Sequence, residues 1–464
     1  MPIDTTALID DLTARLDADT LITDPDRVAS YLHDEAEWAP YGKPAAVVRA
    51  RSAQDAQAVV QVCHQHRAPV VARGAGTGLS GGANALDGGV VLSLELMREI
   101  VEIDELERIA VVQPGVVNDD LRAACAERGL WYPPDPASSP WSTIGGNAAT
   151  NAGGLCCVKY GVTRDYVIGL EFVTGTGDLV RVGRRTAKGV VGYDLVGLLV
   201  GSEGTLGIIT EITVKLRPLR DPERTIAGYF PDLVSAGRAV TAVAAAGLTP
   251  SALELVDRTC LQAVDDWKNM GLSTEADTVL LGRIDTPGAQ GDAEAALMEQ
   301  VFSDSGAGFA VVSSDPQEAE LLFAARRLAY PALERLGDVL TEDVCVPKSQ
   351  VAPVLAEIQA IAARHDTVIA NIAHAGDGNL HPLLITQPGD AAARERAQLA
   401  FHEIIDVALA AGGTVTGEHG VGLLKMDGLH AELSAPVVEL HRAIKSAMDP
   451  AGILNPGKVF RAQG

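Results

Sequence analysis

The sequence predicts an α+β protein of two domains, and three observations lead to this expectation. The chain has 464 residues, more than one ordinary core accommodates, and 47% of them are apolar. Short strand-like and helical runs alternate in the first half, whereas the second half pairs longer helices with strand-like runs, as in an antiparallel sheet backed by helices. The proline- and charge-rich stretch RPLRDPERT, near residue 220, separates the two patterns and predicts a domain boundary.

In the first half, the clearest helix signal lies at 52–66, where Ser52 and Asp55 form a cap pattern ahead of helically spaced apolar residues. A second helix is expected at 118–129. Apolar runs bounded by turn residues predict strands at 68–73, 88–96, 108–116, 167–174 and 207–219. Residues 131–154 show little periodicity, and a loop of that length inside a compact domain is usually functional.

In the second half, apolar residues at helical spacing predict helices at 233–247 and 349–365. The strand-like runs between and around these helices are 278–284, 307–314 and 367–376. The chain closes with DPAGILNPGKVF, a turn-rich segment that follows a helix.

Charge and cysteine content narrow the classes of partner. Lys and Arg number 37 against 61 Asp and Glu, so the net charge of −24 argues against a nucleic-acid backbone or an anionic membrane as the main partner. The six cysteines lack framework spacing, which fits a reducing cytoplasm. The N-terminus lacks the order of a signal peptide, and no uncharged run reaches the roughly 18 residues of a membrane span. An anionic ligand would then need a local positive group, an arginine or a metal.

A glycine-rich loop, RGAGTGLSGGAN at 73–84, follows a predicted strand. It has the Gly-x-Gly-x-x-Gly spacing from Gly76 onward, but that fingerprint has to open a helix, and the next apolar run is strand-like. A nicotinamide site and a plain surface turn remain alternatives to a nest of backbone N–H groups for a pyrophosphate. Residues 133–154 and 191–210 offer similar chemistry, and three such loops in one domain favour a phosphate-bearing cofactor.

These segments resemble the FAD-binding domain of the vanillyl-alcohol oxidase (PCMH) type. The motifs that carry the resemblance are Arg73-Gly-Ala-Gly-Thr-Gly, Pro134-Asp-Pro, Ser142-Thr-Ile-Gly-Gly-Asn and Gly201-Ser-Glu-Gly-Thr-Leu-Gly. From about residue 40 onward, the chain is similar to the FAD-linked D-2-hydroxyacid dehydrogenases. That branch includes D-lactate dehydrogenase, the glycolate oxidase flavin subunit and D-2-hydroxyglutarate dehydrogenase.

The resemblance implies an FAD-binding domain at 1–219 with a returning segment at 425–464, and a substrate or cap domain at 220–424. It also implies noncovalent FAD, because covalent members often carry a histidine where this sequence has Thr77. The residues expected to bind FAD are Arg73, Gly74, Ala75, Gly76, Thr77, Gly78, Pro134, Asp135, Ser142, Thr143, Gly145, Gly146, Asn147, Asn151, Gly153, Glu203, Gly204, Gly207, Ile208 and Ile209.

HAGDGNLH, from His374 to His381, places two of the ten histidines around a turn sequence. If its central GDGN forms a hairpin turn, the two histidines face each other with Cβ atoms about 4.5–5.5 Å apart, which suits a divalent metal. Two satisfied polar residues are the alternative. VTGEHGVG adds Glu418 and His419 at the end of a strand-like run, and a His2Glu set leaves positions open for substrate.

Spacing alone does not separate the roles of Glu418 and His419. The resemblance implies that His374, His381 and Glu418 bind the metal and that His419 is the base. Zinc suits these ligands, and manganese or iron(II) would also fit. The substrate's C2 hydroxyl and carboxylate would chelate the ion, an imidazole with the ordinary pKa of about 6.5 would take the proton, and the C2 hydride would pass to flavin N5.

Arg326, in LLFAARRLAYPALERL, aligns with the family's substrate-binding arginine. A guanidinium holds a carboxylate bidentately, although without the family a solvated surface charge is the simpler interpretation. Tyr330 follows one helical turn later and is expected to line the pocket. Asn455 lies in LNPGK, which resembles the family's closing segment, and is expected to contact flavin or substrate.

The chain has Thr341 where D-2-hydroxyglutarate dehydrogenases typically carry a lysine for the distal carboxylate, and Glu342 and Asp343 would repel one. We therefore expect oxidation of a small D-2-hydroxy acid, D-lactate or glycolate, to the 2-keto acid. The alternatives are D-2-hydroxyglutarate oxidation, a noncatalytic flavin subunit of an electron-transfer complex, and the ether-lipid synthase branch of the fold.

The sequence does not name the electron acceptor: a quinone, a cytochrome, an electron-transferring flavoprotein and oxygen all remain open. We expect no nucleic-acid partner and no transmembrane anchor. The expected location is the cytoplasm, with peripheral docking on the inner face of the membrane for a quinone route. The oligomeric state is open, a homodimer included.

Overall fold

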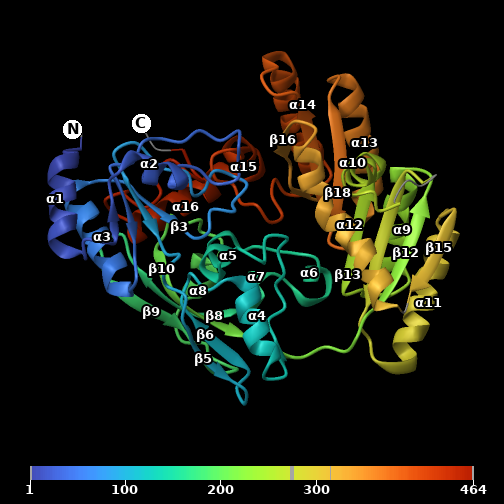
Figure 1. The fold of residues 1–464 in the computed structure, drawn as a ribbon, viewed down its shortest axis with the longest axis horizontal. Helices are drawn as coiled ribbons and strands as arrows, with labels where there is room; N and C mark the ends of the chain where they lie inside the picture. Colours follow the sequence, from blue (N-terminus) through green and yellow to red (C-terminus); the bar gives the residue numbers. More distant parts are fainter. Residues whose placement is uncertain (1–2, 272–275, 314, 462–464) are drawn as a thin grey trace. The chain divides into compact units, whose positions relative to one another are not determined.

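The computed structural model describes residues 3–271, 276–313 and 315–461. Its contacts divide the chain into two compact units, drawn as ribbons in Figure 1. The segments of the first unit are Met1–Gly153, Val162–Leu219 and Glu418–Gly464, and those of the second are Gly154–Gly161 and Arg220–Gly417. The chain thus returns to the first unit at Glu418 rather than at residue 425. The short segment 154–161, here called the excursion, belongs to the second unit, which the sequence does not predict.

The first sheet of the first unit is small and mostly parallel. Its strands, in pairing order, are β1 (Leu21–Ile22), β2 (Ala46–Arg49), β4 (Val90–Ser93) and β3 (Val70–Arg73). β2 and β3 are both parallel to β4, and β1 is antiparallel to β2. Helices α1 (Thr5–Arg15) and α3 (Ala53–His66) pack against each other. α3 begins at the predicted capping box, in which Ser52 and Asp55 satisfy each other's backbone N–H groups.

The second sheet of the first unit is antiparallel throughout. Its strands, in pairing order, are β5 (Ile100–Asp104), β6 (Ile109–Val112), β10 (Ile208–Lys215), β8 (Val167–Val173) and β9 (Leu179–Gly183). The strands β7 (Leu130–Trp131) and β11 (Arg217–Pro218) form a separate two-stranded antiparallel sheet. Buried apolar residues such as Tyr132, Ile144 and Phe172 form one core cluster with this sheet.

Helix α5 (Ile144–Thr150) lies in the stretch where the sequence predicts a loop. The Thr143 hydroxyl caps it by accepting the Gly146 N–H at 3.2 Å, and Asn151 ends it in the left-handed conformation, with φ of 57°. The expectation of a loop was wrong because a helix of seven residues with two adjacent glycines is too short to display a 3.6-residue period.

The remaining helices of the first unit are short except near the C-terminus. They are α2 (Pro25–Val28), η1 (Ala29–Tyr31), α4 (Asn118–Ala126), α7 (Thr163–Tyr166), α8 (Leu195–Leu199), α15 (Met426–Glu432) and α16 (Ala435–Met448). The returning segment then joins the edge of β3. The Val70 N–H donates to the Ile453 carbonyl at 2.8 Å, and the Asn455 N–H donates to the Val70 carbonyl at 2.8 Å.

The second unit is built on one antiparallel sheet, as the sequence predicts. Its strands, in pairing order, are β15 (Phe309–Ser313), β12 (Arg224–Phe230), β14 (Thr278–Ile284), β13 (Ala252–Asp257), β18 (Val368–His374), β19 (Asn379–Thr386) and β16 (Asp338–Thr341), with β17 (Val344–Cys345) also paired to β19. This order places β13, β18 and β19, which carry candidate site residues, next to one another in the interior of the sheet.

Helices accompany this sheet along the chain. They are α6 (Cys157–Tyr160), α9 (Leu233–Ala245), α10 (Arg258–Lys268), α11 (Gly288–Asp304), α12 (Pro316–Glu334), η2 (Lys348–Gln350), α13 (Val351–Arg364) and α14 (Ala391–Ala410). α10 packs against α12, and α9 packs against α13. Within the described ranges, none of the helices is both long enough and apolar enough to cross a membrane.

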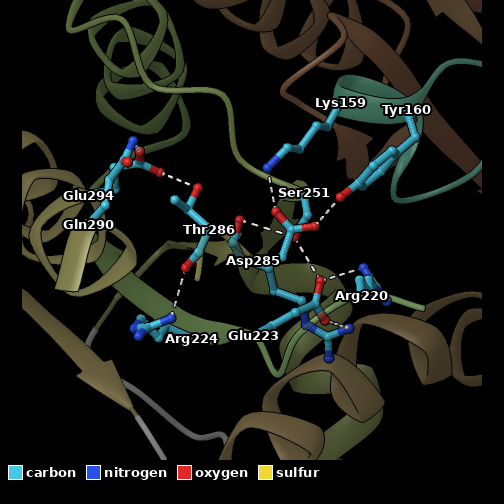
Figure 2. A network of polar contacts seen from close by, with 11 residues as sticks. Lys159, Tyr160, Arg220, Glu223, Arg224, Ser251, Asp285, Thr286, Gln290 and Glu294 are labelled. Carbon is cyan, nitrogen blue, oxygen red and sulfur yellow. Dashed lines mark hydrogen bonds and ion pairs between the residues drawn. The ribbon is translucent and has the colours of Figure 1, made fainter. Parts of the chain in front are cut away.

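The excursion at 154–161 is fixed within the second unit by polar and apolar contacts. Figure 2 shows the Lys159 amine and the Tyr160 hydroxyl both directed at the buried carboxylate of Asp285, to which both donate hydrogen bonds. On the apolar side, Val158 approaches Gly376 so closely that a Cβ at Gly376 would lie 2.7 Å from a Val158 methyl group. The turn that follows β18 is therefore packed against this excursion.

Candidate active site

The two histidines of HAGDGNLH end β18 and lie near the start of β19. The strands pair His374 with Asn379 and Ile372 with His381, so the turn is Ala375–Gly378 rather than GDGN. The expectation that the two histidines directly oppose each other was therefore wrong. Gly378 explains the register: its φ is +81°, and a Cβ there would lie 2.0 Å from the Val346 carbonyl oxygen, so only glycine fits this turn position.

The shifted register still leaves both histidines on one face of the sheet, because residues two apart in a strand point the same way. The ring centroids of His374 and His381 are 5.2 Å apart, and the ring planes meet at 89°. One ring nitrogen of each lies within 4.8 Å of one of the other. Both side chains are buried, with 4% and 5% exposed. Two buried imidazoles with ring nitrogens this close are a pair that could hold one metal ion.

Each histidine has a carboxylate next to its Nδ1 atom. Glu254 lies opposite His374 in the neighbouring strand β13, and its two oxygens are 2.9 and 3.0 Å from His374 Nδ1. Asp343 Oδ1 is 3.7 Å from His381 Nδ1. In metal sites, such carboxylates orient the ring and leave Nε2 directed at the ion. Both carboxylates are fully buried, and the sequence does not mark Glu254, because it lies in the strand ALELVD with apolar residues on both sides.

Arg326 is buried in α12, with 7% exposed, so the solvated-surface alternative is wrong. Its Nε donates to Glu254 Oε2 at 3.0 Å, the same carboxylate that contacts His374. Arg326 and His374 are thus brought together through one glutamate. Tyr330 follows one helical turn later in α12, is half-buried and packs against a buried apolar cluster.

Residues 414–417 lead from the second unit toward Glu418 and His419. The structure has only a β-bridge here, between Thr414 and Cys345, so the strand-like run expected before Glu418 is wrong. The Thr416 hydroxyl and the Gly417 N–H donate to Asp343 Oδ2 at 2.6 and 3.1 Å. Asp343 thereby fixes the backbone directly before Glu418.

Glu418 is the first residue of the returning segment of the first unit. Its carboxylate lies against Gly153: a Cβ at Gly153 would be 2.3 Å from Glu418 Oε1, so a larger residue there would displace the carboxylate. Gly153 is one of the residues expected to bind FAD. Glu418 and His419 are both half-buried. The structure thus places Glu418 beside the segment that contains α5.

The first glycine-rich loop follows β3, and the side chain of Arg73, at the end of that strand, packs against it. Arg73 is buried at the strand end, and its Nη1 donates to the His33 carbonyl at 2.8 Å. The guanidinium folds over Gly76, where φ is +80° and a Cβ would collide with it. Gly74 abuts Thr143, with only 2.5 Å between a Cβ there and the Thr143 hydroxyl oxygen. No helix begins in this loop, which ends at β4, so the Rossmann alternative is wrong.

The three glycine-rich segments contact one another within the first unit. The Gly201 N–H donates to the Ala148 carbonyl of α5 at 2.9 Å, and the Glu203 N–H donates to the Ala149 carbonyl at 2.8 Å. A Cβ at Gly82 would lie 3.4 Å from Glu203 Oε2. The structure therefore brings together, within one unit, the segments that the sequence proposed as a single cofactor site.

The returning segment supports the same loops. Asn455 Nδ2 donates to the carbonyl oxygens of Gly82 and Glu203 at 2.9 and 2.8 Å, and Lys458 Nζ donates to the Gly82 carbonyl at 3.0 Å. Glu203 accepts the backbone N–H groups of Val421 and Gly422 at 2.8 Å each. Burial raises the pKa of Glu203 to about 7 and lowers the pKa of Lys458 to about 7.

Two buried polar atoms in this region fit a bound cofactor. The Ser142 hydroxyl and the Asn147 Nδ2 have no hydrogen-bond partner among the described residues, although Ser142 is only 2% exposed and Asn147 only 4%. Buried polar groups are normally satisfied, so such atoms indicate a missing partner. Ser142 lies directly before the α5 cap and Asn147 lies in α5, and both are among the residues expected to bind FAD. The residues present fit FAD.

Comparison with known proteins agrees with this architecture. Residues 44–183 match an FAD binding domain, and residues 221–459 match the C-terminal domain of FAD linked oxidases. Glycolate oxidase subunit GlcD of Bacillus subtilis is 43% identical over 90% of this chain and 89% of its own length. D-lactate dehydrogenase of Anaerostipes hadrus is 35% identical over 92% of each chain.

Among solved structures, 4-ethylphenol oxidase from Gulosibacter chungangensis superimposes with a TM-score of 0.82 at 19% identity, covering 99% of this chain and 98% of that one. p-Cresol methylhydroxylase gives 0.81 at 20% identity, with 98% and 97% covered. The fold is thus that of vanillyl-alcohol-oxidase (PCMH)-type flavoproteins. The chain belongs to the FAD-linked oxidases and is an FAD-dependent oxidoreductase.

Replacing Ser142 with alanine is expected to weaken FAD binding about threefold to tenfold, since one hydrogen bond contributes about 0.5–1.5 kcal/mol. The melting temperature of the FAD-free protein should not fall, because the hydroxyl has no partner among the described residues. Fluorescence titration of the FAD-free protein with FAD gives the affinity. Ser139→Ala, at a half-buried serine of the same segment, is the matched control. Equal affinities of the two variants would remove Ser142 from the FAD site.

Proposed function

We propose that this protein oxidises a small D-2-hydroxy acid, D-lactate or glycolate, to the 2-keto acid, using noncovalent FAD and a divalent metal. The observation that carries the proposal is the His374–His381 pair, two buried rings on one sheet face with a carboxylate beside each Nδ1. The relatives support the substrate class, because two of them are named as a glycolate oxidase subunit and a D-lactate dehydrogenase.

His374, His381 and Glu418 would hold the metal, with positions left open for substrate. Glu418 is the chain neighbour of Gly417, whose N–H is hydrogen-bonded to Asp343, and Asp343 in turn lies 3.7 Å from His381 Nδ1. Two imidazoles and one carboxylate suit zinc, and also manganese or iron(II). A divalent ion there would polarise the C2 hydroxyl of the substrate, which makes its proton easier to remove.

Arg326 would bind the substrate's carboxylate. Its Nε is hydrogen-bonded to Glu254, which leaves the two terminal NH2 groups as the donors that a carboxylate accepts in a fork arrangement. Tyr330 would line the pocket from the next turn of α12. Asn455 would act on the flavin side, since its amide holds the Gly82 and Glu203 carbonyls.

His419 would accept the C2 hydroxyl proton while bound FAD accepts the C2 hydride. Two adjacent residues would then have different roles: Glu418 would bind the ion, and His419 would accept the proton. Glu203, which is buried and accepts the Val421 and Gly422 N–H groups of that same segment, would support the FAD site.

The acidic residues after β16 favour a monocarboxylate. Glu342 and Asp343 are fully buried, and Asp343 lies next to His381, where a second substrate carboxylate would meet like charge. D-2-Hydroxyglutarate oxidation remains the second candidate. We propose a cytoplasmic protein that passes electrons to a quinone, a cytochrome or an electron-transferring flavoprotein. The relative named as a subunit is consistent with a role within a larger complex.

Anaerobic addition of D-lactate or glycolate to the FAD- and metal-loaded protein is expected to bleach the flavin absorption band. L-Lactate should act much more slowly, because its C2 hydrogen points away from the flavin when the hydroxyl and carboxylate occupy the same sites. D-2-Hydroxyglutarate should be the weakest of the D-acids. Stopped-flow spectra with these four acids provide the measurement. Faster bleaching by D-2-hydroxyglutarate would select the second candidate, and no bleaching by any acid would favour a noncatalytic flavin subunit.

A further inference from the structure

Glu254 is a carboxylate in the middle of a fully buried strand. Every residue of β13, Ala252–Asp257, is buried, and Glu254 itself has no exposed area. A buried carboxylate costs several kcal/mol unless hydrogen bonds and an opposite charge compensate it. The partners of Glu254 supply this compensation.

The first partner is His374. The two residues are paired across β13 and β18, and both glutamate oxygens are within 3.0 Å of His374 Nδ1. Because a carboxylate oxygen accepts a hydrogen bond, the ring hydrogen belongs on Nδ1 and the lone pair on Nε2. The neighbour thus selects the tautomer in which His374 can bind a metal through Nε2.

The second partner is Arg326. Its Nε donates to Glu254 Oε2 at 3.0 Å, and both side chains are buried, with 8% and 0% of the side chain exposed. Binding at Nε fixes the plane of the guanidinium and leaves the two terminal NH2 groups for a ligand. Arg327, the next residue of α12, pairs instead with Glu320.

We propose that Glu254 is a positioning residue that orients the metal ligand His374 and the substrate-binding Arg326 through one carboxylate. The inference rests on the proposed function and adds a coupling to it: metal affinity and substrate affinity depend on the same side chain. A residue that only neutralised Arg326 would influence the substrate and leave the metal unaffected.

The test is Glu254→Gln, which keeps the size of the side chain and replaces one oxygen by an amide NH2. With the remaining oxygen accepting from Arg326, the NH2 faces His374 Nδ1 and favours the tautomer whose Nε2 carries the hydrogen. Titration of the metal-stripped, FAD-loaded protein with Co2+, followed by its visible absorption, is expected to show affinity lowered about 10- to 100-fold. The KM for D-lactate is expected to rise about fivefold to tenfold.

Glu171→Gln is the matched control. Glu171 is also a buried strand glutamate with an arginine and a hydroxyl partner, Arg181 and Thr210, both at 2.9 Å, but it lies in β8 of the first unit. It should change neither Co2+ affinity nor KM. Co2+ affinity and KM equal to those of the wild type in Glu254→Gln would overturn the inference and leave the proposed function standing. Failure of the wild type to bind Co2+ would overturn both.

Glu254→Asp keeps a carboxylate, which covers the case in which Glu254→Gln does not fold. The side chain is shorter by one methylene, so it cannot hold both partners at about 3 Å. Either Co2+ affinity or KM, or both, should then deteriorate. Wild-type values of both parameters in this variant would also overturn the inference. They would show that metal and substrate binding do not require simultaneous contacts of the carboxylate with His374 and Arg326.

Discussion

Replacing His381 with alanine is expected to remove the bound divalent ion and slow flavin reduction by D-lactate about 10³-fold or more. Polarisation of a substrate oxygen by a metal is worth several kcal/mol, and each 1.36 kcal/mol is a factor of ten in rate. His381 lies in β19, and its ring is 5.2 Å from that of His374, so its loss removes one of the two buried imidazoles of the proposed site. Metal analysis by mass spectrometry and anaerobic stopped-flow kinetics give the two quantities.

The control for this variant is His365→Ala. His365 also pairs with a carboxylate, Glu403, at 2.6 Å, and belongs to the same unit, but it lies at the end of α13. It should retain the metal and the rate. FAD content should be equal in both variants, because the glycine-rich segments belong to the first unit. Full activity of metal-free His381→Ala would show that the histidine pair has a role other than metal binding.

The histidine pair shows what a sequence pattern can and cannot specify. Two histidines flanking a turn sequence predict that both rings lie near a hairpin end, and they do. The register depends on Gly378, whose positive φ and contact with the Val346 carbonyl come from β17 and its flanking residues, distant in sequence. The observed partner of His374 is two residues away from the expected one, which is a whole period of a β-strand, so the two rings still lie on one face. The common face was thus predictable, whereas the direct opposition was not.

The contact of Glu254 with His374 could not be predicted from the sequence for a different physical reason. It precedes His374 by 120 residues, and only the pairing of β13 with β18 brings the two together. In the sequence, one glutamate among apolar residues is indistinguishable from the polar position of a half-buried strand. Knowledge of the strand order would have made it conspicuous, because a central strand covered on both faces has no solvated side for a carboxylate.

The contact among the three glycine-rich segments was more predictable, because its signal is local. Loops at 73–84, 133–154 and 191–210 each carry glycines whose backbone geometry is encoded by the glycine itself, at Gly76 for example. The sequence does not reveal helix α5, yet the resemblance assigns several of its residues to the cofactor. The support that Asn455 and Lys458 give to Gly82 could not be read from spacing, since it depends on the returning segment joining β3.

Replacing His419 with glutamine is expected to lower the rate of flavin reduction about 10²- to 10⁴-fold while FAD and the divalent ion remain bound. Glutamine approximates the size of the imidazole and keeps hydrogen-bonding groups, but it cannot accept a proton at neutral pH. A positioned base acts only on the rate of proton removal, so the KM for D-lactate should change little. Stopped-flow reduction, metal analysis and the FAD absorption spectrum separate these effects in one preparation.

Glu418→Gln provides the matched comparison, because the two positions are adjacent and spacing alone does not distinguish them. Loss of a carboxylate ligand should reduce metal occupancy and therefore slow reduction, whereas His419→Gln should slow reduction at full occupancy. Excess Zn2+ should restore part of the rate to Glu418→Gln and none to His419→Gln. The opposite pattern would be loss of the ion from His419→Gln and rescue of that variant by Zn2+. It would show that His419 is the metal ligand and that Glu418 is not.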